Sequence, residues 1–354
     1  MRILVLNAGS SSLKYQLIET GVRDEHVIVK GAVERIGAAG SPVHNHTEAV
    51  EEILPNLGPI DGVGHRVVHG GERFKASALI DLEVEHAIAD CCSLAPLHNP
   101  HHLACYRAAH ALLPNVPHVA VFDTAFFHTI PRRAFLYAVP YELYESDHIR
   151  RYGFHGTSHR YVSGKAAEQL GIPPDEVKLI TCHLGNGCSV AAIEGGKAVD
   201  ISMGLTPQEG LVMGTRSGDI DIGVIFHLAR QKGMTLDEIE KLLIHRSGLL
   251  GLSGRSNDMR DLVHAAQEGD ARARIAVEVF CYRVKKYIGA FWAILGGADA
   301  IVFTGGIGEN RPEIRDEIMA GLENLGAVEV LVIPTNEELV IARDTARLIG
   351  RGRA

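Results

Sequence analysis

The sequence predicts an α/β protein built from two related domains, and three observations support this prediction. First, the chain has 354 residues, more than the roughly 250–300 residues at which one hydrophobic core stops growing. Second, short apolar segments typical of strands alternate with longer segments of helical periodicity. Third, a strand–turn–strand pattern near the N-terminus recurs about halfway along the chain. This is what two related domains facing a shared cleft would produce.

The repeated unit begins with a strand, a tight turn and a second strand. In the first copy, residues 3–6 are a continuous apolar run, and apolar and polar residues alternate over 13–17. In the second copy, strands are predicted over 179–183 and 189–193, and a third strand follows over 198–201. Asn7 and His183 are then equivalent, 176 residues apart. The apolar strands 119–122 and 300–303, offset by 181 residues, are a second candidate pair.

Several helices can be placed from the signals at their ends. Thr235 and Glu238 form a capping box ahead of an apolar stripe, and residues 271–295 keep a helical pattern without proline. A C-terminal helix is capped by Thr335 or Asn336 and is expected to stop at Gly350. We predict a solvated loop over residues 37–58, which contain Gly, Ser and Pro.

Composition and charge exclude several classes of protein. The apolar fraction of 46% and the charged fraction of 22% match ordinary globular proteins. The net charge of −8 argues against nucleic acid or an anionic membrane as the main partner. The sequence has no run of about 18 apolar residues, so no membrane span is expected. The six cysteines contain no C-x-x-C pair, which favours reduced thiols and a cytoplasmic protein.

Four glycine-rich turns follow apolar strands and could bind anions through backbone N–H groups. They are residues 7–12, 184–187, 214–218 and 305–310. Glycine lets a phosphate approach the backbone closely, although each turn taken alone could be ordinary structure. The sequence lacks both G-x-x-x-x-G-K-[ST] and G-x-G-x-x-G, so neither a P-loop nor the usual dinucleotide motif is available.

Four polar residues are candidates for binding or catalysis. Arg66 lies in an apolar strand and Arg216 in a Gly/Ser turn, so each guanidinium must reach a cleft or a partner. Each could hold a carboxylate or phosphate bidentately, or form an ion pair with a structural Asp or Glu. Asp123 ends an apolar strand, where open α/β sheets place ligands, and a structural turn is the alternative. His155 lies among aromatic and small polar residues, and taken alone such a residue is more often a structural histidine. The histidines within residues 98–102 lack a suitably spaced third ligand, so zinc is not favoured.

The motifs, in order from residue 3 to residue 350, resemble those of the acetate kinase family. Asn7-Ala-Gly-Ser-Ser-Ser-Leu-Lys14 resembles one family signature, and Met213-Gly-Thr-Arg-Ser-Gly-Asp-Ile-Asp221 resembles the other. The further segments that fit the family are residues 64–71, 94–100, 122–126, 152–159, 183–187, 303–310 and 333–339.

This resemblance implies two duplicated actin-like domains, each with a ribonuclease-H-like core, and an active site in the cleft between them. The first domain would comprise residues 1–124 with a returning helix at 338–354. The second, residues 125–337, would bind the nucleotide and form a homodimer. The implied reaction is reversible phosphoryl transfer from ATP to acetate, giving acetyl phosphate and ADP, with magnesium or manganese as the metal.

The resemblance also implies the roles of individual residues. Asn7 and Glu337 match the metal site, Arg66 matches the site of the acyl carboxylate, and the catalytic positions are Asp123, His155 and Arg216. The apolar pocket for the methyl group corresponds to Val68, Leu97, Phe154 and Pro207. The nucleotide-binding positions are Lys14, His183, Leu184, Gly185, Asn186, Gly187, Asp258, Met259, Arg260, Gly306, Ile307, Gly308, Glu309 and Asn310.

The implied chemistry needs no general base. An aliphatic carboxylate has a pKa of about 4.3, so the nucleophile is already ionised at neutral pH. It needs relief from repulsion by the polyphosphate and alignment for in-line attack, which Arg66, Arg216, His155 and a metal ion would provide. Our hypothesis is therefore that Asp123 orients magnesium or its waters.

The sequence departs from the family pattern in several places. Residues 126–129 read Phe-Phe-His-Thr where the family has Phe-His-Gln-Thr, Cys188 replaces the usual Ser, and residues 100–103 are unusual. The chain is also shorter before Gly62 and between residues 310 and 333, which bears on nucleotide preference.

Two alternative functions remain at this point. One is the same reaction with propionate or another short acid, since a methylene group is worth only about 1–3 kcal/mol in an apolar pocket. The other is a non-catalytic ATP-binding module of the actin-like group. Such a module would bind ATP without any carboxylate-dependent formation of ADP.

Overall fold

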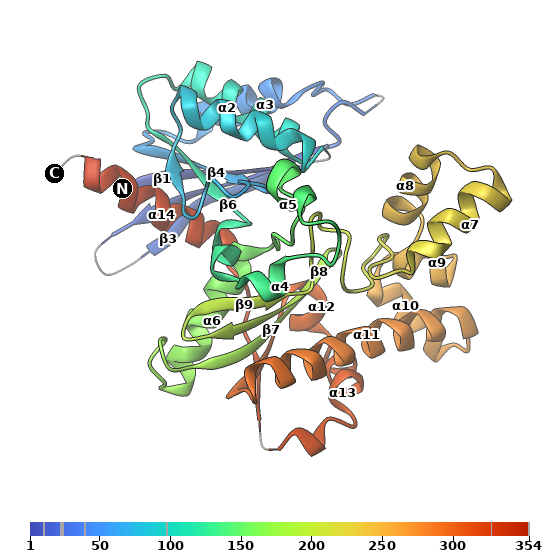
Figure 1. Cartoon of the computed structure of the whole chain (residues 1–354). Helices are drawn as coiled ribbons and strands as arrows, with labels where there is room; N and C mark the ends of the chain where they lie inside the picture. Colours follow the sequence, from blue (N-terminus) through green and yellow to red (C-terminus); the bar gives the residue numbers. More distant parts are fainter. Residues whose placement is uncertain (10, 22–24, 39, 97, 327, 353–354) are drawn as a thin grey trace. The chain divides into compact units, whose positions relative to one another are not determined.

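The computed structural model describes residues 1–9, 11–21, 25–38, 40–96, 98–326 and 328–352 (Figure 1). The chain divides into two compact units. Unit 1 comprises Met1–His128 and Asn336–Ala354, and unit 2 comprises Thr129–Thr335. The sequence placed these divisions after residue 124 and before residue 338.

The described part of unit 1 contains a six-stranded sheet in the order β3-β2-β1-β4-β6-β5. Strand β1 is antiparallel to β2 and parallel to β4, and β4 is parallel to β6. The carboxyl ends of β1, β4 and β6 therefore meet at one edge of the sheet. The strands are β1 (Arg2–Ala8), β2 (Ser12–Thr20), β3 (Glu25–Glu34), β4 (Gly62–Val67), β5 (Ala78–Leu79) and β6 (His118–Phe122).

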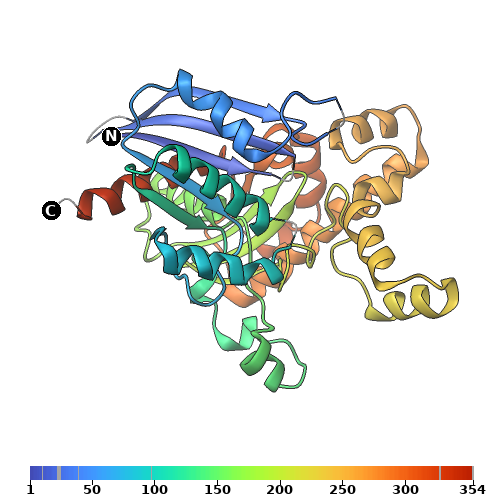
Figure 2. The ribbon, with the colours of Figure 1, turned by 90° about the horizontal axis from the view of Figure 1, so that it is seen from above.

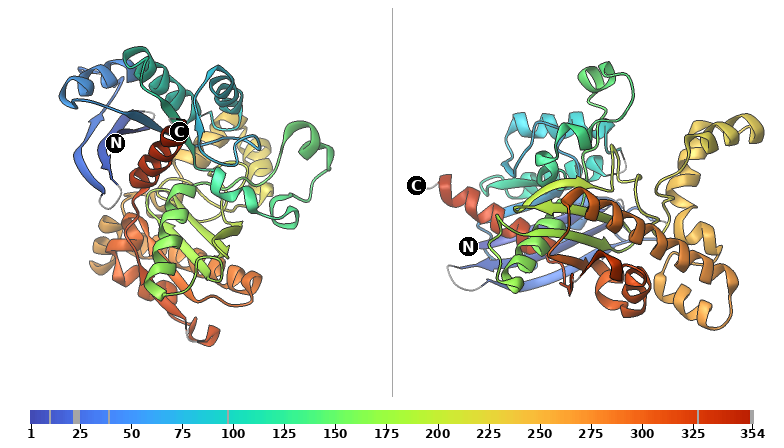
Figure 3. Two further views of the ribbon diagram at one scale, coloured as in Figure 1. Left: turned by 90° about the vertical axis from the view of Figure 1, so that its left-hand side faces the viewer. Right: turned by 60° about the horizontal axis from the view of Figure 1, so that its bottom comes forward.

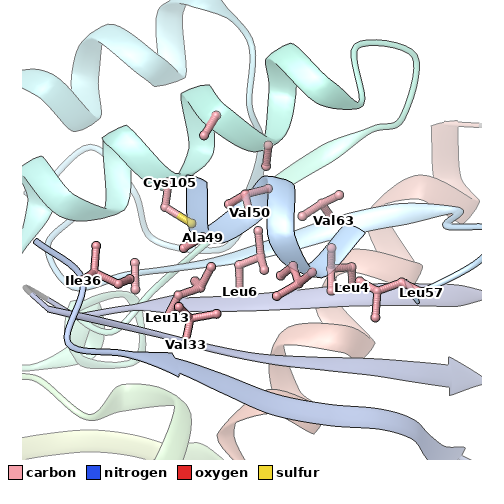
Figure 4. Packing of buried hydrophobic residues seen from close by; sticks show 14 of the residues in the cluster. Leu4, Leu6, Leu13, Val33, Ile36, Ala49, Val50, Leu57, Val63 and Cys105 are labelled. Carbon is pink, nitrogen blue, oxygen red and sulfur yellow. The ribbon is translucent and has the colours of Figure 1, made fainter. Parts of the chain in front are cut away.

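Helices cover both faces of this sheet. The first face carries α1 (His46–Ile53), α2 (Leu82–Asp90) and α3 (Asn99–Leu112), and the second carries α14 (Glu337–Gly352) (Figure 1, Figure 2). Leu4 and Leu6 of β1 belong to the core under α1 and α3 (Figure 4), whereas Ile3 and Val5 pack with Ile341 of α14. Because both faces are covered, β1 is an apolar run without alternation.

Glycine at position 64 allows α14 to approach the sheet closely (Figure 3). A Cβ atom at Gly64 would lie 2.5 Å from Thr345 Oγ1 and 2.6 Å from Ile341 Cγ2. The helix begins after Asn336, whose Oδ1 accepts a hydrogen bond from Leu339 N at 3.0 Å, as one of the two predicted caps. The predicted stop at Gly350 is wrong, because Gly350 does not adopt the left-handed conformation and the helix continues to Gly352.

The predicted loop over residues 37–58 contains helix α1, so that prediction was also wrong. Asn45 caps the helix by accepting a hydrogen bond from Glu48 N at 3.0 Å, and Glu48 Oε2 accepts one from His44 N at 2.7 Å. Val50 (Figure 4) is then buried in the core under α1 and α3, and Ile53 belongs to the same core. The capping pattern and the apolar spacing were both present, but Gly, Ser and Pro near the ends of the segment outweighed them.

Unit 2 repeats this arrangement of strands. Its described residues form a five-stranded sheet in the order β11-β10-β7-β8-β9, in which β7 is antiparallel to β8 and parallel to β10. The strands are β7 (Lys178–Leu184), β8 (Cys188–Glu194), β9 (Lys197–Ile201), β10 (Ala300–Thr304) and β11 (Glu329–Val332). The orders β3-β2-β1-β4-β6 and β9-β8-β7-β10-β11 correspond strand for strand, which confirms the duplication. Asn7 and His183 are each the sixth residue of corresponding strands, β1 and β7.

One pair of strands was matched wrongly. The sequence equated residues 119–122 with residues 300–303, but the sheet order makes β4 the counterpart of β10 and β6 the counterpart of β11. All four are short apolar strands, so their local composition does not reveal their order in a sheet.

The two helices of unit 2 that the sequence predicted are both present. Helix α11 (Ala271–Leu295) has the expected bounds, and α8 (Leu236–His245) begins with the predicted capping box. Helices α6 (Gly156–Leu170) and α11 both pack against β7. The remaining helices are α4 (Arg132–Phe135), α5 (Glu142–Asp147), α7 (Ile222–Lys232), α9 (Gly248–Ser253), α10 (Met259–Gln267), α12 (Gly305–Asn310) and α13 (Pro312–Met319).

Two further findings concern the whole described chain. Across its described residues, no helix is both long and apolar enough to cross a bilayer. All six cysteines are free thiols, as the sequence predicted.

Candidate active site

Arg66 and Asp123 form a buried ion pair at the edge of the unit 1 sheet. Their strands, β4 and β6, are parallel neighbours, so the two residues emerge side by side. Arg66 Nε donates to Asp123 Oδ1 at 3.1 Å, and Arg66 Nη2 donates to Oδ2 at 2.7 Å. Asp123 is only 1% exposed. Burial alone would lower the pKa of Arg66, but Asp123 and Glu337 raise it above its ordinary value.

Two more oxygen-bearing side chains lie beside the same guanidinium. Asn7 Oδ1, at the end of β1, is 3.4 Å from Arg66 Nη1, and Glu337 Oε2, at the start of α14, is 3.8 Å from Nη2. Amide and carboxylate oxygens are ligands that Mg²⁺ accepts. The described residues contain no cluster of three or more His, Cys, Asp or Glu side chains suited to a metal. A metal ion held here would therefore keep waters or take oxygens from its substrate, as Mg²⁺ commonly does.

The buried residue Val68 follows β4 directly, and the segment after it is held by two side chains of α3. Val68 N donates to His102 Nδ1 at 3.3 Å. The carboxamide of Asn99 bonds both His69 N, at 3.1 Å, and His69 O, at 2.9 Å. His102 and Asn99 of the histidine-rich segment therefore hold the backbone of residues 68 and 69 in place. Leu97, predicted for the same apolar pocket, lies outside the described residues.

In unit 2, His155 and His183 form a stacked pair next to the β7–β8 turn. Their ring centroids are 4.3 Å apart. His155 Nδ1 shares a hydrogen bond with Ser189 Oγ at 3.0 Å, and His183 Nδ1 shares one with Ser158 Oγ at 2.7 Å. His155 has a φ of 60°, a conformation that is uncommon for a residue with a side chain and is concentrated at functional sites.

Arg216 also lies next to the β7–β8 turn. A Cβ atom at Gly187 would lie 3.3 Å from the His155 ring and 3.8 Å from Arg216 Nη1, so both side chains lie close to this glycine. Arg216 Nη1 donates to Pro207 O at 2.9 Å, and no described carboxylate lies within ion-pair distance of it. Burial lowers the pKa of Arg216, and the Cys188 thiolate would oppose this effect. The guanidinium therefore carries a positive charge that the described residues do not compensate.

Beside this turn, unit 2 has a cavity of about 660 Å³, a size suited to a small organic ligand. Eight residues predicted for nucleotide binding line it: Gly185, Asn186, Asp258, Met259, Arg260, Gly306, Ile307 and Asn310. Asn257 and Arg311 also line it and were not predicted, although each directly adjoins a predicted segment. Asn257 Nδ2 donates to Asn186 Oδ1 at 3.1 Å, which connects the β7–β8 turn to the start of α10.

The other predicted nucleotide residues do not line this cavity in the described structure. Lys14 is exposed on β2 of unit 1, opposite Asn7. The carboxylate of Glu309 binds the backbone of two segments, because its Oε1 accepts hydrogen bonds from Gly305 N at 2.8 Å and Thr335 N at 3.0 Å. His183 and Leu184 belong to β7, Gly187 to the β7–β8 turn and Gly308 to α12.

Cys188 occupies the start of β8, where a serine was expected from the family pattern. Its Sγ donates to Gly185 O at 3.1 Å. Burial raises its pKa to about 12, so the side chain is a neutral thiol at physiological pH. The thiol thus makes a hydrogen bond to the turn that a serine hydroxyl could also make.

Comparison with known proteins identifies relatives along the whole chain. The acetokinase family model matches residues 2–53 and 43–328. An acetate kinase of Thermotoga maritima is 51% identical over 400 aligned positions, covering 99% of both chains. A crystal structure of Porphyromonas gingivalis acetate kinase matches with a TM-score of 0.92 at 43% identity, covering 98% of this chain and 99% of that one. A propionate kinase from Francisella tularensis matches with the same TM-score and coverage at 41% identity.

The alignment also confirms that this chain is shorter than its relatives. The 400 aligned positions exceed the 354 residues of this chain by 46. At least that many positions of the T. maritima alignment are therefore gaps in this sequence.

Proposed function

This chain belongs to the acetokinase family, whose members are kinases that phosphorylate a carboxylate, and we propose that it is an acetate kinase. It would transfer a phosphoryl group reversibly from ATP to acetate, forming acetyl phosphate and ADP, with Mg²⁺ or Mn²⁺. The observation that carries this proposal is the closeness of His155 and Arg216 to Gly187, since both side chains lie within 4 Å of the position that a Cβ atom would take there. The turn that contains Gly187 also contributes Gly185 and Asn186 to the cavity.

Arg216 and His155 are the groups that we propose to stabilise the transferring phosphoryl group. Phosphoryl transfer depends mainly on positioning and on neutralising the charge of the equatorial oxygens. Arg216 has an uncompensated charge and a planar fork of donors, which suits a phosphate. The cavity lined by α10 and α12 would hold the nucleotide.

Arg66 is the group that we propose to bind the acyl carboxylate. An oxygen of that carboxylate attacks the terminal phosphorus, and the bond from phosphorus to the bridging oxygen of ADP breaks, with its electrons remaining on ADP. Asp123 is not needed as a base, and both of its oxygens accept hydrogen bonds from Arg66. Asp123 would therefore fix the direction of the Arg66 guanidinium. Under our hypothesis it would also orient the metal ion or its waters.

Asn7 and Glu337 are the residues that we propose to hold the metal ion, with Asp123 beside them. All three side chains carry oxygen atoms that can coordinate a metal ion. A divalent cation bound there would supply positive charge to the phosphate oxygens. If Asp123 orients that ion or its waters, raised Mg²⁺ should partly restore the activity of Asp123→Asn, whereas an unchanged metal dependence would count against the hypothesis.

Propionate is the second candidate substrate. A propionate kinase is among the solved structures that match at a TM-score of 0.92. The proposed methyl pocket includes Val68 in unit 1 and Phe154 and Pro207 in unit 2. One extra methylene changes binding by only about 1–3 kcal/mol, so both acids are tested side by side.

We also propose a homodimer formed through α7 and α8 of unit 2. Helix α7 has no buried residue, and the side chains of Ile222 and Phe226 are 66% and 50% exposed. Leu236, at the start of α8, is 74% exposed. Both helices extend away from the sheet of their own unit (Figure 3). Sedimentation velocity of the wild type and of Phe226→Glu tests this: a dimer that weakens in the variant supports it, and a monomeric wild type refutes it.

The decisive experiment traps acyl phosphate with hydroxylamine. The protein is incubated with ATP, Mg²⁺ and each acid from formate to butyrate, and the hydroxamate and ADP are measured. We expect turnover with an optimum at acetate, whereas an optimum at propionate would establish the second candidate. ATP binding without acid-dependent ADP formation for any acid would instead indicate the non-catalytic binding module.

A further inference from the structure

A hydrogen-bonded network in unit 2 connects the segment that carries His155 to the loop that carries Arg216. At its centre, Glu209 accepts from two side chains. Tyr137 Oη donates to Glu209 Oε2, and Arg151 Nη2 donates to Glu209 Oε1 at 2.5 Å. Arg151 and Glu209 are 16% and 31% exposed, so this ion pair is largely shielded from water.

The same side chains hold the backbone at the start of the loop. Arg151 Nη1 donates to three successive carbonyl oxygens, those of residues 201, 202 and 203, at 2.9, 3.2 and 3.1 Å. Leu205 N donates to Tyr137 Oη at 2.9 Å. A Cβ atom at Gly204 would overlap the Glu209 carboxylate and the Tyr137 hydroxyl. The backbone at Gly204 therefore lies in direct contact with the side chains of Glu209 and Tyr137.

The network also reaches the segment of His155 directly. Tyr152 N donates to Gly204 O at 3.0 Å, and Phe154 and His155 follow Tyr152 in the chain. On the loop, Pro207 comes two residues before Glu209, and Pro207 O accepts the hydrogen bond from Arg216 Nη1. Glu209 is thus joined by short chains of contacts to each proposed substrate-binding residue of the two segments.

The residues on either side of Glu209, Gln208 and Gly210, are bonded to the last part of the loop by contacts of their own. Asp219 Oδ1 accepts from Gly210 N at 2.8 Å, and Asp219 Oδ2 accepts from Tyr287 Oη at 2.7 Å. Gln208 Nε2 donates to Ser217 Oγ at 3.0 Å. Because these bonds do not involve the Glu209 carboxylate, its loss should shift the loop without unfolding it.

We infer that Glu209 is a positioning residue that, through Arg151 and Tyr137, sets Pro207 and Arg216 relative to His155. This inference rests on the proposed function and adds a residue to its machinery. Glu209 would not touch the substrate, since both carboxylate oxygens already accept hydrogen bonds. The cavity proposed for the nucleotide is lined by other elements, the β7–β8 turn, α10 and α12. Glu209 should therefore govern the acid and the chemical step but not the affinity for ATP.

The test measures the steady-state kinetics of wild type, Glu209→Gln, Glu209→Ala and Tyr137→Phe, varying acid and ATP separately. We expect Glu209→Ala to lower kcat/KM for the acid on the order of 10- to 100-fold, because misplacement by about 1 Å costs up to this much. Glu209→Gln keeps an acceptor and should lose less. KM for ATP should stay within about twofold for every variant. The control is Glu194→Ala, which removes an exposed ion pair with Lys178 of the same unit and should change neither constant.

The double variant Tyr137→Phe/Glu209→Gln separates positioning from general destabilisation. If the two side chains act through one contact, their combined effect on kcat/KM for the acid is smaller than the product of the single effects. Effects that multiply, an equal rise of both KM values, or a lowered Tm with unchanged kcat/KM would each overturn the inference. A wild type without acid-dependent turnover would instead refute the proposed function itself.

Discussion

Acid should destabilise unit 1 through a pair of buried histidines on neighbouring strands. His65 of β4 and His118 of β6 share a hydrogen bond between Nε2 and Nδ1 of 2.9 Å, and their rings stack at 5.2 Å. His118 Nε2 donates to Leu113 O at 3.3 Å, so its Nδ1 must accept the proton of His65 Nε2. A proton added at His118 Nδ1 would turn this bond into two opposed N–H groups.

The loss of stability can be worked out from the pKa of His118. Burial lowers this pKa from 6.5 to about 4, with the Leu113 carbonyl opposing the effect and His110 adding to it. Burial and then His118 lower the pKa of His65 well below its ordinary value. The unfolded chain therefore takes up the protons first as the pH falls, so stability present above about pH 6.5 is lost towards pH 4. A shift of about 2.5 units for His118 alone corresponds to about 3 kcal/mol.

Apart from the Leu113 carbonyl, the described side chains whose rings contact the pair offer no negative charge that would stabilise the added proton. Tyr106 contacts both rings edge-on, and His110 contacts His118 edge-on. In these contacts the neighbours are an aromatic ring and a further imidazole, and neither carries a negative charge at neutral pH.

The assay is urea unfolding followed by circular dichroism at pH values from 7.5 to 4.5. The wild type should lose stability steeply below pH 6.5, and His118→Asn, which keeps an acceptor for His65, should show a shallower dependence. His86→Asn, at an exposed position on α2 of the same unit, should keep the wild-type slope. Equal slopes for the wild type and His118→Asn would refute the reasoning.

Three further changes test other parts of the structure. Gly64→Ala should cost about 1–3 kcal/mol of stability by overpacking against α14. Its control is Gly164→Ala in α6, where an added Cβ atom meets nothing within 4 Å and should raise Tm slightly. Calorimetry compares the Tm values of the two variants. Asp123→Ala should raise KM for the acid and lower kcat, because Arg66 loses both hydrogen bonds that fix its direction, and initial rates at varied acid check this. Arg216→Lys should lower kcat about 10³-fold with an unchanged Tm, because Arg216 has no carboxylate partner within the described chain; a large loss of Tm would contradict this reasoning.

The fold was predictable to the extent that its elements carry local patterns. The apolar runs of β1 and β7 and the capping box of α8 depend on residues close in the sequence, and each was placed correctly. The order of strands in a sheet is a non-local property, so the apolar segments 119–122 and 300–303 were paired although β10 corresponds to β4. Helix α1 was missed for a different reason, since its cap and apolar stripe compete with turn-forming residues at both ends.

The residues of the candidate site also divide into those that a local sequence pattern reveals and those that it does not. Arg66 and Asp123 were each singled out from their place in or after an apolar strand, with an ion pair and a functional role as alternatives for Arg66. In the structure the ion pair and the functional role of Arg66 are compatible. The Asp123 carboxylate pairs with the Arg66 guanidinium and thereby determines which N–H groups of Arg66 remain for a substrate. Glu209 had no such signal: its partners Arg151 and Tyr137 are 58 and 72 residues away, and a glutamate in a Gly- and Pro-containing loop looks solvated. A residue that contacts a substrate often stands out by its local motif, whereas a residue that positions other residues is defined by contacts across the fold. Such positioning residues are therefore the part of an active site that a single sequence conceals.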